Sequence, residues 1–270
     1  MIGSIIGDIV GSTFEFVNIK TKEFPLFPKG SEFTDDSILS FATADWLLHG
    51  GNAATYYCGY AMRYPNPMGG YGSSFKGWVV RASRQGDFSP YNSCGNGSAM
   101  RVGPVGWAFE AEAEVLDAAR LSAACTHNHP EGIKGAQATA LCIFMARKGA
   151  SKAEIQEAVE KRFNYDLSMT TDELRPRYSW QGIDGKGNGG ICQESVPQAI
   201  RAFIDGNDFE DCVRNAISIG GDSDTIGCIT GSIAEAFYGV PDDLRNQAQA
   251  ILTPDLLTVL TDFEAKYGKK

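Results

Sequence analysis

Gly220-Gly221-Asp222-Ser223-Asp224-Thr225-Ile226-Gly227 is the stretch on which the fold prediction rests. Its two leading glycines permit a sharp loop, and a run of apolar and small residues over 225–237 follows. Such a run, closed by a glycine and a proline, indicates a buried helix. Asp222 and Asp224 therefore lie at a helix N-terminus, where capping accounts for one carboxylate only. A bound cation is the simplest way to hold both.

A second stretch of the same kind, Phe33-Thr34-Asp35-Asp36-Ser37, precedes another apolar run over 38–48. A helix cap is the alternative for either stretch alone. Four carboxylates that converge on one cavity without a cation would repel one another, and some would stay protonated. Together with two hydroxyls they form an all-oxygen set that suits Mg²⁺ or Mn²⁺. The predicted metal ligands are Thr34, Asp35, Asp36, Asp222, Asp224 and Thr225.

These two stretches resemble the signature of the ADP-ribosylglycohydrolase family. Gly3-Ser4-Ile5-Ile6-Gly7-Asp8-Ile9-Val10-Gly11-Ser12 and Gly95-Asn96-Gly97-Ser98-Ala99-Met100-Arg101 are similar to that family too. The resemblance implies a binuclear Mg²⁺ or Mn²⁺ centre that cleaves the glycosidic bond joining ADP-ribose to a protein side chain. It places the residues from Thr34 to Asp36 in one ligand cluster and the stretch that follows Gly221 in the other.

The resemblance also implies roles for residues outside the two stretches. Glu15 matches a glutamate near the metals that is linked to substrate gating, and Asp35 or Asp222 could act as the base. For Asp8, a buried structural acid and a substrate contact are equally good interpretations. The implied contacts to the diphosphate and ribose are Ser93, Gly95, Asn96, Gly97 and His127.

Two of these assignments have ordinary alternatives. Glycines on either side of an asparagine let backbone N–H groups approach a phosphate, but Gly-Asn-Gly alone is a turn signal. A histidine at a helix end, such as His127, is usually a surface or capping residue. The resemblance favours substrate binding for both.

Composition bounds the remaining possibilities. The chain has 270 residues without a linker-like segment, which favours one domain. A net charge of −9 argues against nucleic acid binding. No leader-like or membrane-spanning run occurs, so we expect a cytoplasmic monomer that does not contact a membrane. The seven scattered cysteines fit small core residues.

The expected partner is an ADP-ribosylated protein or an ADP-ribose derivative. Arginine-linked ADP-ribose is favoured, and serine-linked or O-acetyl-ADP-ribose are the alternatives within the family. Two other classes stay open: a non-catalytic ADP-ribose-binding protein, and a two-metal phosphohydrolase that releases AMP or phosphate.

Strand patterns are nearly absent from the sequence, which predicts an all-α orthogonal helical bundle with the site in a central cleft. Irregular chain is expected over 64–77 and 164–190, and Tyr178 and Trp180 in the second segment are candidates for stacking on adenine or on the protein target. Helices are expected over 2–16, 38–48, 52–63, 77–85, 111–126, 131–148, 152–163, 193–205, 209–218, 225–238, 242–250 and 255–266.

Overall fold

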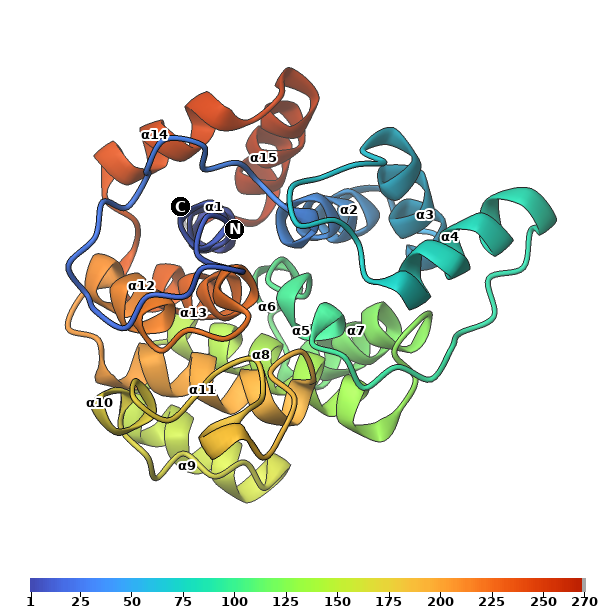
Figure 1. Cartoon of the computed structure of the whole chain (residues 1–270). Helices are drawn as coiled ribbons and strands as arrows, with labels where there is room; N and C mark the ends of the chain where they lie inside the picture. Colours follow the sequence, from blue (N-terminus) through green and yellow to red (C-terminus); the bar gives the residue numbers. More distant parts are fainter. Residues whose placement is uncertain (269–270) are drawn as a thin grey trace.

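The computed structural model describes residues 1–268, and within that range it contains helices and two isolated bridges but no β-strand (Figure 1). The predicted all-α class is confirmed. In chain order the helices are α1 (Ile2–Gly11), α2 (Asp35–His49), α3 (Ala53–Arg63), α4 (Ser73–Gln85), α5 (Gly97–Met100), α6 (Val105–Ala108), α7 (Glu112–Ala124), α8 (Pro130–Arg147), α9 (Lys152–Phe163), α10 (Thr171–Leu174), the 3₁₀ turn η1 (Ile183–Gly185), α11 (Cys192–Asp205), α12 (Phe209–Ser218), α13 (Ser223–Tyr238), α14 (Asp242–Ile251) and α15 (Pro254–Tyr267).

Three helix boundaries differ from the prediction in ways that matter for the site. The first helix ends at Gly11 instead of residue 16, and the chain continues in a tight turn in which the N–H of Phe14 donates to the carbonyl of Gly11 at 2.8 Å. Helix α4 begins at Ser73, four residues before the predicted start, since the glycines that precede it form a loop only up to Gly72. Helix α13 begins two residues early and thereby places Asp224 in its first turn.

Helices α1 and α13 lie side by side at the centre of the molecule (Figure 1). Every residue of α1 is buried. A Cβ atom built on Gly7 would lie 1.9 Å from the carbonyl oxygen of Gly227, and one on Gly11 would lie 2.4 Å from the Cα of Asp224. The two backbones therefore touch where glycines leave room. This contact places Asp8 of α1 beside Asp224 of α13.

No helix in the described range has both the length and the apolar character that a membrane crossing requires. All seven cysteines are free thiols, and five of them are buried, in agreement with their prediction as small core residues.

Candidate active site

A cavity of about 520 Å³ lies where α2, α4, α5 and α13 meet the loops that follow α1 and α10. It brings together almost every residue singled out in the sequence. Thr34 is fully buried and does not line the cavity. The predicted residues on its surface are Glu15, Asp35, Asp36, Ser93, Gly95, Asn96, Gly97, His127, Asp222, Asp224 and Thr225.

Two parts of this surface differ in chemistry, and we name them by their residues. The acidic wall consists of Glu15, Asp35, Asp36, Asp222 and Asp224. The glycine wall consists of Ser93, Gly95, Asn96, Gly97 and His127.

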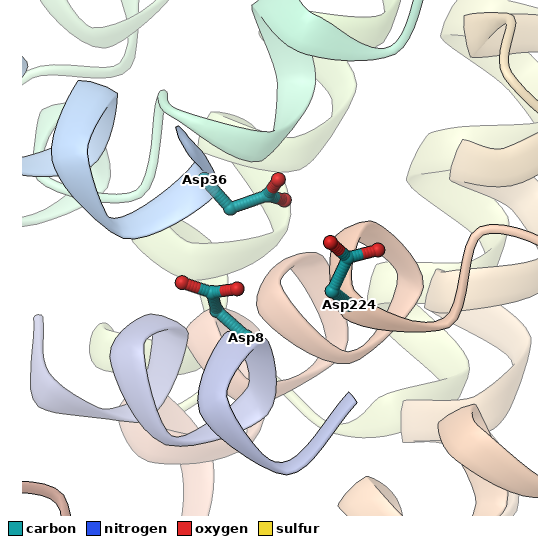
Figure 2. Close-up of side chains that lie close together, drawn as sticks. All are labelled: Asp8, Asp36 and Asp224. Carbon is teal, nitrogen blue, oxygen red and sulfur yellow. The ribbon is translucent and has the colours of Figure 1, made fainter. Parts of the chain in front are cut away.

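Carboxylates from three helices converge at the acidic wall. Figure 2 shows Asp8 of α1, Asp36 of α2 and Asp224 of α13 with their side chains directed toward one another. Oxygen atoms of the three lie within 4.8 Å of one another. Glu15, Asp222 and Asp224 form a second such group, so that Asp224 belongs to both. Each group has the spacing and the hard oxygen donors of a divalent-cation site.

Asp8 is bound to the N-terminus of α2. Its carboxylate accepts hydrogen bonds from the backbone N–H of Thr34 at 2.9 Å, the hydroxyl of Thr34 at 2.6 Å and the backbone N–H of Ser37 at 3.1 Å. The hydroxyl of Ser37 donates a fourth. An acid at a helix N-terminus also interacts favourably with the helix dipole. Of the two interpretations left open for Asp8, these contacts support the structural one.

The side chain of Thr34 forms hydrogen bonds at the same place, where Asp8 of α1 meets the N-terminus of α2. Its hydroxyl donates to Asp8 and accepts from the backbone N–H of Asp36 at 3.2 Å, which makes Thr34 the N-cap of α2. Among the predicted ligands, Thr34 is therefore the one that holds its neighbours in position from behind the cavity surface.

Two oxygens of the acidic wall are buried without a hydrogen-bond partner in the described chain, Oδ1 of Asp36 and Oε2 of Glu15. Burial and the nearby Asp224 and Asp8 raise the pKa of Glu15 to about 8. Burial also raises the pKa of Asp222 to about 7, although a 2.7 Å hydrogen bond from Asn96 opposes the shift. Unpaired oxygens and raised pKa values are what acids prepared for a cation show in its absence. The residues present therefore fit a divalent metal.

The glycine wall is held by the backbone. The N–H of Asn96 donates to the carbonyl of Gly190 at 3.1 Å, and the N–H of Gly95 donates to Oγ of Ser93 at 3.0 Å. A Cβ atom on Gly97 would lie 3.1 Å from Nε2 of His127, so a side chain there would crowd the imidazole. The glycine is needed for this approach.

The loop between α10 and α11 completes the cavity. The indole N–H of Trp180 donates to the carbonyl of Glu15 at 2.8 Å, and its ring stacks on Phe16. Trp180 lines the cavity, but Tyr178 is only 1% exposed and packs against Gly221. The prediction that Tyr178 stacks on a ligand is therefore wrong, because the residue supports the glycine loop from inside.

Sequence reasoning missed several residues on the cavity surface. The stretch Gly70-Tyr71-Gly72-Ser73-Ser74, which leads into α4, was a signal for some of them. Two others, Arg101 and Tyr91, sit beside predicted residues but gave no separate signal. The missed residues include Gly70, Gly72, Ser73, Ser74, Tyr91, Asn188 and Gly190, together with Arg101, which adjoins the cavity although its side chain is fully buried.

Fold and cavity together define the class: an all-α protein in which one cavity joins a carboxylate cluster to a glycine-rich surface. The sequence pattern of the family described as ADP-ribosylglycohydrolase matches residues 1–268. The chain belongs to the ADP-ribosylglycohydrolase family.

Relatives and a solved structure agree with this assignment. The human protein named ADP-ribosylhydrolase ARH3 is 27% identical, over 94% of this chain and 89% of its own length. A Pseudomonas putida protein named ADP-ribosylarginine hydrolase Tri1 is 26% identical, over 89% of this chain and 70% of its own. A solved structure described as an ADP-ribosylglycohydrolase-related protein complex superposes with a TM-score of 0.71 at 25% identity, covering 98% of this chain and 95% of that one.

Proposed function

We propose that this protein is a metal-dependent hydrolase that removes ADP-ribose from a modified protein side chain by cleaving the glycosidic bond at the distal ribose. The observation that carries the proposal is the sharing of Asp224 by two carboxylate groups in one cavity with a glycine-rich surface. Membership of the ADP-ribosylglycohydrolase family supports the reaction class, which is hydrolysis of a bond to ADP-ribose. Carboxylates that flank an anomeric carbon are the usual means of glycoside hydrolysis.

The acidic wall would hold two divalent ions, Mg²⁺ or Mn²⁺. One group of oxygens comes from Asp36 and Asp224, with Asp8 behind them, and the other from Glu15, Asp222 and Asp224. Bound ions would neutralise these acids and bind the hydroxyls of the distal ribose. Thr34, Asp35 and Thr225 complete the proposed ligand set. Asp35 and Thr225 lie on the cavity surface, and Thr34 lies behind it.

The chain's own residues orient the reaction. Asn96 binds Oδ2 of Asp222 at 2.7 Å and so fixes the plane of that carboxylate. Asp35 or Asp222 accepts the proton of the attacking water while positive charge develops at the anomeric carbon. The glycine wall contacts the diphosphate and ribose. Because the N–H groups of Gly95 and Asn96 donate within the protein, the imidazole of His127 is the donor that it offers to the ligand.

Arginine-linked ADP-ribose is our favoured substrate, in keeping with the printed name of the Pseudomonas putida relative. Serine-linked and O-acetyl-ADP-ribose are the alternatives. We further propose a single-domain monomer that acts in the cytoplasm on ADP-ribosylated proteins or ADP-ribose derivatives and binds neither nucleic acid nor membrane.

The test is to incubate the protein with Mg²⁺ or Mn²⁺ and arginine-, serine- or O-acetyl-linked ADP-ribose, and to follow free ADP-ribose by chromatography. We expect free ADP-ribose to be released from one of the three linkages. Chelation of the metal should abolish this release, and the Asp222→Ala/Asp224→Ala protein should not show it. Release of AMP or phosphate would instead identify a phosphohydrolase. Binding of ADP-ribose without turnover of any substrate would identify a non-catalytic binding protein.

A further inference from the structure

A buried arginine lies behind the glycine wall. The side chain of Arg101 is fully buried, and its guanidinium lies 3.9 Å from the ring centroid of Tyr57. Its Nη2 donates to the carbonyl of Ser122 at 2.7 Å and to Oγ1 of Thr126 at 2.8 Å. Within residues 1–268, Arg101 forms no ion pair with a carboxylate. A buried charge held by neutral acceptors alone calls for an explanation.

The hydrogen bond from Arg101 to Thr126 has a fixed direction, and it affects the hydrogen bond between Thr126 and His127. A guanidinium only donates, so Oγ1 of Thr126 must accept from Arg101. The same oxygen lies 2.7 Å from Nδ1 of His127. Arg101 occupies one lone pair of this hydroxyl, and the hydroxyl proton is free to point at Nδ1 of His127. Nδ1 is then the acceptor, and the proton of a neutral imidazole resides on Nε2.

The other ring nitrogen points at the cavity. Nε2 of His127 lies 3.1 Å from the position a Cβ atom would take on Gly97 and 3.5 Å from that on Gly95. It makes no hydrogen bond to any described residue, although His127 is only 6% exposed and lines the cavity. Burial, followed by the charge of Arg101, keeps the pKa of His127 well below its usual value. The imidazole is therefore neutral and carries one proton.

We propose that Arg101 and Thr126 are positioning residues that hold His127 in its Nε2–H form, so that it donates one hydrogen bond to an anionic oxygen bound at the glycine wall. The identity of that oxygen as part of the ADP-ribose diphosphate rests on the proposed function. The proposed tautomer rests on the hydrogen-bond chain and needs no ligand.

The tautomer can be measured without any ligand. Two-bond ¹H–¹⁵N NMR spectra of ¹⁵N-labelled protein at pH 7.5 distinguish a protonated Nε2 from a protonated Nδ1, and the His127→Gln protein assigns the signal among the three histidines. We expect His127 to show a protonated Nε2 and an unprotonated Nδ1. A protonated Nδ1, or a doubly protonated ring, would overturn the proposal.

A matched pair of variants tests the role of the hydroxyl. Thr126→Val removes it at nearly constant shape, and Thr126→Ser keeps it. We expect Thr126→Val to raise the Kd for ADP-ribose about tenfold, the equivalent of about 1.4 kcal/mol, and to raise KM with little change in kcat. Thr126→Ser should recover most of the affinity.

The outcomes separate this proposal from the function on which it rests. Unchanged affinity and unchanged His127 spectra in Thr126→Val would overturn the positioning role. Failure of the wild-type protein to bind ADP-ribose would overturn the proposed function, while the NMR spectra would still decide the tautomer.

Discussion

The acidic wall and the glycine wall face the same cavity but are stabilised in opposite ways. In the acidic wall, Glu15 and Asp36 each leave a buried oxygen without a partner, and burial raises the pKa of Glu15 to about 8. In the glycine wall, Gly95 and Asn96 donate their backbone N–H groups within the protein, and His127 is bonded through Nδ1. The acidic wall requires cations from outside, whereas the glycine wall is held by its own hydrogen bonds and leaves Nε2 of His127 open to the cavity.

The two walls are therefore expected to have different roles: the acidic wall supports the reaction, and the glycine wall binds the substrate. Like charges brought together in a buried site cost free energy that a cation recovers. The neutral glycine wall needs no cation, and the imidazole of His127 faces the cavity where an anionic ligand would bind. Variants of the acidic wall should therefore change metal dependence and kcat, and variants of the glycine wall should change affinity.

The largest effect is expected from Asp224→Ala, because Asp224 belongs to both carboxylate groups. Activity should fall by at least about 10³-fold. The metal-free protein should become more thermally stable at pH 8, since a buried like charge is gone. Steady-state kinetics and thermal melts check both. Asp243→Ala, at an exposed position on α14, is the control. Near-normal activity of Asp224→Ala would contradict the account.

The contact between α1 and α13, which brings the acids together, should be nearly as sensitive to substitution. In Gly7→Ala, the new methyl group would lie 1.9 Å from the carbonyl of Gly227, so α1 and α13 must separate. We expect a loss of about 3 kcal/mol in the free energy of unfolding, measured by urea denaturation. Gly59→Ala is the matched control, because Gly59 is exposed on α3 with no atom near its Cβ position. There we expect a gain of roughly 0.5–1 kcal/mol. Equal effects at the two glycines would rule out close packing as the cause.

A smaller effect concerns pH. Folding raises the pKa of Glu15 from 4.5 to about 8 and that of Asp222 from 3.8 to about 7. Raised values favour the folded state below the unfolded pKa, and this stability is lost as pH rises through the folded pKa. The Tm of the metal-free protein should therefore fall between pH 5 and pH 9, and the gain from Mg²⁺ should grow over that interval.

The pH experiment has an internal control. In Asp222→Asn/Asp224→Asn the fall in Tm should be shallower, because two of the titrating groups are gone. A Tm that is flat or rises with pH in the metal-free wild-type protein would show that the acids are stabilised by the protein itself.

Asn96 links the two walls and should give the smallest effect. Its amide holds Asp222 at 2.7 Å, so Asn96→Ala should lower kcat about 10–100-fold through misorientation of that carboxylate. The Kd for ADP-ribose should change less, because the backbone of the glycine wall is retained. A rise in Kd that matches the fall in kcat would show instead that Asn96 acts through binding.

The sequence was informative where local pattern decides structure. Apolar runs placed most helices, and acids before two such runs placed Asp36 and Asp224 on one cavity. The sequence was uninformative where contacts between distant segments decide the position of a side chain. Thr34 faces Asp8 because α1 and α2 meet there, and Tyr178 is buried because it packs on a glycine loop 43 residues further along the chain. Neither contact has a signal in local spacing.

The central claim is that the acidic wall is built for two divalent ions. An EPR titration of free Mn²⁺ at pH 7.5 counts the bound ions per chain without reference to any substrate. We expect saturation near two Mn²⁺ per chain for the wild-type protein and a loss of tight binding in Asp224→Ala. No saturable binding, or identical binding by the wild-type and Asp224→Ala proteins, would contradict it.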